Sequence, residues 1–563
     1  MNSAKRKKRS LLLIFAQAVG LTSTALASTA AGEEVLYNGI VLPDKWPPSD
    51  ESDPRKPPPY LESPPAVIPI DVGRQLFVDD FLVESTTLAR TFHLATYYEG
   101  NPVLKPDKPW ELLREGGHGP NAMVYSDGVW YDPQDKLLKM WYQGNYYPRE
   151  TCYATSKDGV HWDKPDLDVV PGTNIVMPTD GDRRDANTVW LDLNEEDPQQ
   201  RYKMWQVMHY KPGGMSESRL GLFFSGDGIH WRKIVQSEKP TLYGERTTVF
   251  YNPFRGTWVY SVRSRTRELG RARHYQEDND LIAGTRLVEK GARLWVGSDE
   301  LDPRFPPWDV KCQLYNLDCV AYESLILGLF TVWRGDVSDN PLDRPKMNEI
   351  CLGYTRDGYH WTRPDRRAFC PVSEKKGDWN YGNVSSAGGC CLVIGYKLYF
   401  YVSGRAGRPG GGNASGECST GLATLRRDGF ASMGAGSAQG ELTTRPVRFN
   451  GKHMFVNADC DDGELRVEIL DLQDKVIAPF SRDNCIPIKV DKTLQAVQWQ
   501  GTDDLSRITG RTVKFRFYLT NGQLYAFWVS PTLNGASHGY VAAGGPGFTG
   551  HADTVGADGY SPE

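Results

Sequence analysis

Short runs in which apolar and polar residues alternate recur along most of the chain, and they predict β-strands. Examples are the runs at residues 139–142, 202–205 and 397–401. A period of two places successive side chains on opposite faces of a strand, so each run can bury one face in a core. Glycine, proline, asparagine and aspartate separate the runs, which indicates antiparallel sheets joined by tight turns.

One phrase, Asp-Gly-x-His-Trp, is repeated along the chain. Complete copies lie at residues 156–162, 225–231 and 355–361, and weaker copies begin at Ser298 and Arg427. Five units fit the interval 70–440, and units repeated at a nearly fixed period are typical of four-stranded sheets arranged around an axis. We therefore predict an all-β fold with a five-bladed β-propeller at residues 70–440. A tandem of β-sandwiches is the alternative.

The regions on either side of this interval differ from it in composition and in residue pattern. Residues 441–530 alternate cleanly and predict a β-sandwich that follows the propeller. The interval 28–69 holds ten prolines among charged residues, so we expect a stiff, Pro-rich leader there. The last residues, 531–563, are rich in Gly, Ser and Ala and predict a flexible tail.

The N-terminus predicts export. A basic segment at residues 5–9 precedes an apolar stretch at 11–21 and the small-residue series Ala25-Leu26-Ala27, the order of a secretory signal peptide over residues 1–27. The apolar stretch is shorter than the ~20 residues of a spanning helix. We expect a secreted or periplasmic protein without a membrane span.

Composition excludes several classes of function. Lys and Arg number 65 against 70 Asp and Glu, and the net charge of -5 gives no polycationic surface for nucleic acid. The phosphate-binding glycine loop, the Gly-x-Ser-x-Gly elbow and the His-Glu-x-x-His motif are all absent from the sequence. Ten cysteines permit disulfides in an oxidising compartment, but their spacing favours buried or bridged thiols over a zinc site.

Candidate chemistry comes from the residues around the starts of the five predicted inner strands. In a propeller these positions converge on one central funnel, and three of the five carry a carboxylate: Asp185, Glu245 and Asp318. Clustered carboxylates repel, so one can keep its proton while another stays ionised. Glycoside hydrolysis needs such a pair. The alternative for each single acid is a turn or capping residue.

Other polar and aromatic residues near the same strand starts are candidates for substrate binding. They are Arg184, Arg246, Asn121, His118, Asn383 and Trp110. A cluster of arginines at residues 263–273 has two interpretations. It would favour an anionic sugar if it overhangs the funnel, or it forms a solvated loop held by surface ion pairs.

Three features of the chain carry a resemblance to known proteins: the opening at residues 75–84, the Ser-x-Asp-Gly-x-His-Trp units and the predicted closing sandwich. With them the chain resembles the five-bladed propeller glycosidases around glycoside hydrolase families 32 and 43, particularly bacterial exported proteins similar to family 32. The resemblance spans roughly residues 70–530 and implies three acids in the funnel. Asp185, in Arg-Asp-Ala where family 32 has Arg-Asp-Pro, matches the transition-state stabiliser. Glu245 matches the general acid by its blade position.

The sequence also departs from that family. The family 32 sequence Trp-Met-Asn-Asp-Pro-Asn-Gly is absent, and Glu245 is followed by Arg where family 32 has Cys. The first blade has Gly119-Pro120-Asn121 and no acid, so the acid that the family places there must come from elsewhere. Asp80 or Asp79 of the opening, or Asp318, are the candidates, and Asp80 is favoured. A turn or a calcium ligand is the alternative role for Asp79 and Asp80. The departures argue against fructan as the substrate.

Together these observations predict a secreted glycoside hydrolase that acts from a chain end on plant or algal polysaccharide. Its partner is the carbohydrate substrate; no cofactor is required, and a structural calcium ion is left open. The alternatives are a carbohydrate-binding propeller without catalysis and a glycoside phosphorylase on the same fold.

Overall fold

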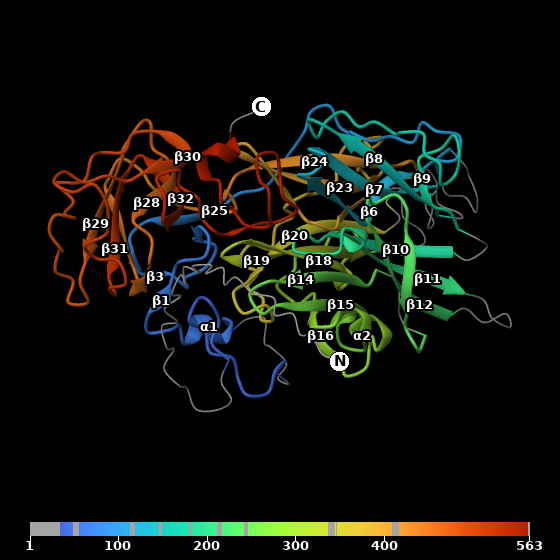
Figure 1. The fold of residues 1–563 in the computed structure, drawn as a ribbon, viewed down its shortest axis with the longest axis horizontal. Helices are drawn as coiled ribbons and strands as arrows, with labels where there is room; N and C mark the ends of the chain where they lie inside the picture. The colour runs from blue at the N-terminus through green and yellow to red at the C-terminus, as the bar shows by residue number, and fades with distance from the viewer. Residues whose placement is uncertain are drawn as a thin grey trace, which may run out of the picture.

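The structure is a computed structural model that describes residues 34–48, 56–112, 119–145, 149–179, 183–210, 217–240, 246–335, 344, 346–407 and 416–560. The expectation of an all-β fold is confirmed, because helices in these ranges are few and short. They are α1 (Pro59–Glu62), α2 (Leu281–Arg286) and the 3-10 turns η1 (Pro198–Gln200) and η3 (Gly556–Tyr560). Figure 1 shows the strands gathered in two groups, with the orange C-terminal strands β28 to β32 apart from the rest.

The larger group consists of five antiparallel sheets, each made mainly of consecutive strands. The first sheet contains β6 (Ala122–Asp132), β7 (Leu137–Gly144), β8 (Thr151–Ser156) and β9 (Ile175–Met177). The second contains β10 (Arg183–Leu191), β11 (Tyr202–Tyr210), β12 (Glu217–Ser225) and β13 (Arg232–Gln236). The third contains β14 (Thr248–Asn252), β15 (Thr257–Thr266), β16 (Gly270–Asp278) and β17 (Arg293–Gly297). The fourth contains β18 (Gln313–Glu323), β19 (Leu325–Gly335) and β20 (Met347–Thr355). The fifth is β21 (Asn383–Ser386), β22 (Leu392–Ile394), β23 (Lys397–Arg405) and β24 (Cys418–Arg426).

These five sheets form a closed ring of contacts. The first strand of each sheet contacts the first strand of the next, and β21 of the fifth sheet contacts β6 of the first. The chain that precedes the first sheet also completes the fifth, since β5 (Thr96–Tyr97) pairs with β24 through Tyr97 and Ala423. One hydrophobic core, which includes the buried Trp141, Trp205 and Phe400, runs through the sheets.

The repeated phrase forms the same turn in each complete copy. In the first copy Asp158 Oδ1 accepts hydrogen bonds from the backbone N–H groups of Val160 and His161, both at 2.8 Å. The His161 ring contacts the other carboxylate oxygen at 2.7 Å. Gly159 has a φ of 79°, a left-handed conformation that favours glycine. The copies around Asp227 and Asp357 repeat these contacts, so the phrase encodes a turn and its histidine holds the turn aspartate.

The second group has two sheets around a separate core. One contains β30 (Asp491–Ala496), β28 (His453–Asp459), β32 (Gly522–Ser530), β25 (Ala431–Ala435), β4 (Ala89–Phe92) and β2 (Gln75–Leu76). The other contains β29 (Glu464–Leu470), β31 (Lys514–Thr520), β26 (Gly440–Thr444) and β3 (Val83–Thr86), and a parallel pair joins β1 (Ile68–Pro69) to β27 (Val447–Arg448).

The boundary of this second group differs from the expected interval 441–530. Strands β2, β3 and β4, at residues 75–92, belong to it, whereas the sequence predicts them in the propeller. The segment between β2 and β3 explains the difference, because its apolar side chains Phe77, Phe81 and Leu82 pack into the second core. Phe77 lies 5.8 Å from Phe527 of β32, measured between ring centroids.

The expected leader and tail are both corrected where the structure describes them. In the leader, Leu36, Ile40 and Tyr60 are buried because apolar side chains between the prolines pack into the second core. In the tail, β33 (Tyr540–Val541) pairs with β18, and Phe548 is buried. Small residues here permit close packing of backbones: a Cβ on Gly545 would lie 1.7 Å from the Val393 carbonyl oxygen.

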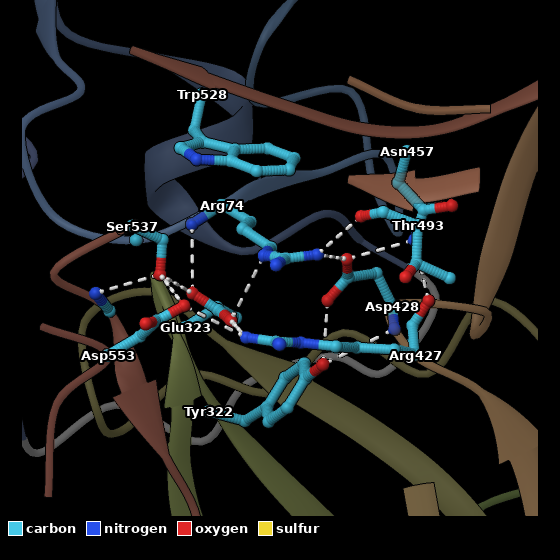
Figure 2. A network of polar contacts seen from close by, with 12 residues as sticks. Arg74, Tyr322, Glu323, Arg427, Asp428, Asn457, Thr493, Trp528, Ser537 and Asp553 are labelled. Atoms are coloured by element: carbon cyan, nitrogen blue, oxygen red, sulfur yellow. Dashed lines mark hydrogen bonds and ion pairs between the residues drawn. The ribbon is translucent and has the colours of Figure 1, made fainter. Parts of the chain in front are cut away.

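A buried ionic network joins the two groups of sheets to the tail (Figure 2). Arg427 Nη2 lies 3.1 Å from Glu323 Oε1 of β18 and 3.1 Å from Asp553 Oδ2 of the tail. Arg74, from the opening, lies 2.8 Å from Asp428 Oδ2. The side chains of all five residues are fully buried.

The ten cysteines all lie among the described residues, all are buried, and none forms a disulfide. Within the described ranges, no helix combines the length and the apolar character needed to cross a membrane.

Candidate functional site

Bulges in the inner strands disturb the regular order of side chains at the centre of the ring. The pairing of β6 with β7 skips from Met123 to Gly128, and that of β10 with β11 skips from Arg184 to Asn187. A bulge bends its strand and re-aims the residues within it. The bulge of β6 contains Tyr125, whose φ of 51° is left-handed. The residues between these pairs therefore depart from the alternation of an ordinary strand.

Two contacts show that side chains of non-neighbouring sheets meet. Asn316 Nδ2 of β18 donates a hydrogen bond to Ser126 Oγ of β6 at 3.1 Å. The guanidinium carbon of Arg246, which precedes β14, lies 4.0 Å from the centroid of the Tyr125 ring of β6. The first sheet is adjacent to the second and the fifth in the ring, not to the third or fourth. Both contacts therefore cross the centre of the ring.

Asp185 of β10 lies in this central group, and its carboxylate has several partners. Arg149 Nη1 donates to Asp185 Oδ1 at 2.9 Å, and the hydroxyl of Tyr125 donates to the same oxygen at 3.4 Å. His209 Nε2 lies 3.2 Å from Oδ2. The Arg149 guanidinium thus compensates the charge of this buried carboxylate.

Asp127 of β6 is a second buried carboxylate, 57 positions before Arg184 in the chain. Arg184 Nη1 donates to Asp127 Oδ1 at 2.9 Å, and both side chains are fully buried. The other oxygen, Oδ2, has no hydrogen-bond partner among the described residues. Burial raises the pKa of Asp127, and the nearby Arg184 opposes this effect.

Asp318 of β18 is the third buried carboxylate near the centre of the ring. Its Oδ2 accepts hydrogen bonds from Ser386 Oγ at 2.5 Å and from Asn316 Nδ2 at 2.7 Å, while Oδ1 has no partner in the described part of the chain. Burial raises the pKa of Asp318, and the positive charges of Arg246 and Arg273 act against the increase. A carboxyl group of raised pKa near ionised groups is suited to proton transfer near neutral pH.

The structure thus brings together four of the predicted residues: Asp185, Asp318, Arg184 and Arg246. Arg184 has a supporting role, because its Nε donates to the Arg149 carbonyl oxygen at 2.9 Å while Nη1 binds Asp127. Two further predictions, Glu245 and His118, lie outside the described residues.

The remaining predicted residues lie elsewhere or serve the backbone. Asp80 is corrected: its side chain is 69% exposed and paired with Arg90 at 2.5 Å in the second group of sheets. Trp110 donates its indole N–H at 3.1 Å to Asn174 Oδ1, next to the outer strand of the first sheet. The amide of Asn121 donates to the Asn145 carbonyl at 2.9 Å, and that of Asn383 donates to the Lys346 carbonyl at 2.5 Å.

Sequence reasoning missed Asp127, Tyr125, Arg149 and His209. Asp127 precedes a glycine, and the pair is typical of a turn between strands; here it sits in a bulge inside a long inner strand. Its signal was the unusual length of the apolar run around it. Arg149 precedes β8 and His209 lies near the end of β11, and neither residue belongs to a local motif.

No metal site is evident among the described residues, where no group of three or more His, Cys, Asp or Glu side chains could hold an ion. The calcium alternative for the Asp79 and Asp80 pair also meets a difficulty. Asp79 forms a buried ion pair with Arg356 at 2.9 Å, whereas Asp80 pairs with Arg90. The two carboxylates have different partners and do not share one ion.

Neither a protein-family model nor a curated protein matches the sequence. Several solved structures are similar to the chain at low identity. An N-acetylgalactosamine deacetylase from F. plautii is 13% identical with a TM-score of 0.39, over 58% of this chain and 97% of that chain. A glycosyl hydrolase from Bacteroides ovatus is 12% identical with a TM-score of 0.37, over 62% and 96% of the two chains. A sucrose-6-phosphate hydrolase from Lactobacillus gasseri is 10% identical with a TM-score of 0.37, over 77% and 93%. All three TM-scores are below 0.5, so these similarities assign no function to the chain.

Proposed function

We propose that the chain is an exported glycoside hydrolase whose five sheets are the blades of a propeller and whose second group of sheets is a β-sandwich. The substrate is a plant or algal polysaccharide that is cleaved from a chain end. The observation that carries the proposal is the convergence of Asp127, Asp185 and Asp318, from three different inner strands, on one polar centre of the ring. Two of these acids present an oxygen without a partner among the described residues.

Roles follow from the partners of each acid. Asp185, compensated by Arg149, suits the ionised carboxylate that stabilises the positive charge of the transition state. Asp318 suits the base or nucleophile, because burial raises its pKa and strengthens it as a proton acceptor. Glu245, which precedes Arg246 in the sequence, is the proposed general acid. The exposure of Asp80 favours Asp318 over it.

The test is turnover by the purified mature protein on a panel of plant and algal glycans. We expect release of sugar by the wild type and a loss of about 10²- to 10⁴-fold in Asp318→Asn and Glu245→Gln, as for removal of an acid or base. Asp80→Asn is the matched control and should retain wild-type turnover. Binding of glycans without turnover by the wild type would overturn the proposal in favour of a carbohydrate-binding propeller.

A further inference from the structure

Three arginines near the centre of the ring have guanidinium nitrogens that lack hydrogen-bond partners. Among the described residues, none of the three side-chain nitrogens of Arg246 has a partner, and the same is true of Arg271 Nε and Arg273 Nη1. Arg246 and Arg273 are fully buried, whereas Arg271 is half-buried. Buried polar groups are normally hydrogen-bonded, so five unpaired donors in one place require an explanation.

These arginines are neighbours, and aromatic rings lie between and beside them. The guanidinium carbon of Arg246 is 5.6 Å from the Tyr315 ring centroid, and that of Arg271 is 5.7 Å from the same ring. Arg271 also lies 5.1 Å from the ring of Trp333. Arg273 donates from Nη2 to the Arg246 carbonyl oxygen at 2.6 Å. The group therefore extends from a half-buried edge at Arg271 to the buried Arg246.

None of the described carboxylates forms an ion pair with these arginines. Asp318 is the carboxylate that influences both Arg246 and Arg273, but it forms no ion pair with either and is hydrogen-bonded to Ser386 and Asn316. Burying a guanidinium without a counter-ion is strongly unfavourable. An anion that joined the site would remove that cost.

We propose that Arg246, Arg271 and Arg273 bind the carboxylate of an acidic sugar unit of the substrate. This inference rests on the proposed function and narrows its substrate to uronate-containing glycans. A planar carboxylate matches the fork of guanidinium donors. The rings of Tyr315 and Trp333 provide apolar faces against which a sugar ring can pack, a feature that free phosphate would not need.

The experiment measures binding by calorimetry, independently of turnover. The probes are a uronate oligosaccharide, the same oligosaccharide with its carboxylates methyl-esterified, and inorganic phosphate. We expect the acidic oligosaccharide to bind, and the esterified form to bind about 10- to 100-fold more weakly, as for loss of charge-assisted hydrogen bonds. Arg246→Met and Arg271→Gln should show the same weakening toward the acidic form. Arg267→Gln, on the exposed turn of the same hairpin, is the control and should bind like the wild type.

Each result separates this inference from the proposed hydrolase. Arg271 is half-buried, so Arg271→Gln keeps the test informative if Arg246→Met fails to fold. Equal binding of acidic and esterified probes, or unchanged binding in both variants, overturns the inference even when neutral glycans are cleaved. Binding of phosphate alone, lost in Arg246→Met, overturns it in favour of phosphorolysis. Arg246-dependent binding of the acidic probe without cleavage supports the inference and contradicts the hydrolase.

Discussion

Replacing Arg427 by methionine tests whether the buried ionic network holds the molecule together. Arg427 has no exposed surface and pairs with Glu323 and Asp553, each at 3.1 Å (Figure 2). The substitution keeps an unbranched apolar stem but removes the charge, so three carboxylates would share Arg74. Breaking a buried pair by removing one partner costs about 3–5 kcal/mol, because it leaves a charge without compensation.

The assay is urea unfolding followed by tryptophan fluorescence, with limited proteolysis of the C-terminal segment. We expect Arg427→Met to lower the unfolding midpoint and to speed cleavage within residues 531–560, which Asp553 anchors. The neighbouring Arg426→Met is the control: Arg426 also donates to Asn457 and Ala458, but its ion pair is with the exposed Asp491, so its removal should cost less than that of Arg427. Equal midpoints for the two variants would refute the argument that burial makes this network important.

Two further predictions concern the repeated turn. Partial burial acts to raise the pKa of Asp227, but hydrogen bonds from the ring and the backbone N–H of His230 lower it. The resulting pKa of Asp227 is about 2, against ~3.9 for an unfolded aspartate. Its contribution to stability is therefore present above about pH 4 and is lost as the pH falls toward 2; an NMR titration that gives an ordinary pKa would contradict this. In Gly228→Ala the new Cβ would lie 2.5 Å from Trp141, and the residue has a φ of 81°. Gly172→Ala is the control, because Gly172 has a φ of 80° but no neighbour within 4 Å, and its left-handed strain should cost roughly 1–2 kcal/mol. Thermal unfolding should show a larger loss of stability for Gly228→Ala than for Gly172→Ala.

The sequence was sufficient to predict features that depend on local chemistry. The Asp-Gly-x-His-Trp phrase predicts its turn because the aspartate, glycine and histidine contact one another within a few residues. The weaker copy at Ser298 was misplaced, since it follows β17, the fourth strand of its sheet. The third strand, β16, ends at Asp278, and Asp280 then caps α2 instead of forming the repeated turn.

Features that join distant parts of the chain could not be predicted in this way. The pairing of Arg427 with Asp553 depends on the path that brings the tail back to β18, and the glycine-rich composition of that tail resembles a flexible segment. Asp127 is a similar case: its central position results from a bulge, and a bulge changes the direction of a side chain without changing the apolar pattern around it. Asp80 misled in the opposite direction, because its motif connects β2 and β3, which belong to the second group of sheets.

The buried ionic network around Arg427 and the buried arginines around Arg246 differ in their partners. We therefore expect the first to contribute to stability and the second to binding. Arg427 and Arg246 are both fully buried, so removing either from water carries a similar cost. Arg427 recovers that cost through ion pairs with Glu323 and Asp553, whereas Arg246 has no ion pair among the described residues. Arg246→Met should therefore leave the unfolding midpoint unchanged or raise it, while it weakens binding of the acidic probe. A protein that keeps a buried charge without an ion pair in its interior gives up stability for function. If Arg246→Met instead lowered the midpoint as far as Arg427→Met does, Arg246 would belong to the architecture of the ring, and the binding role assigned to it would lose its physical basis.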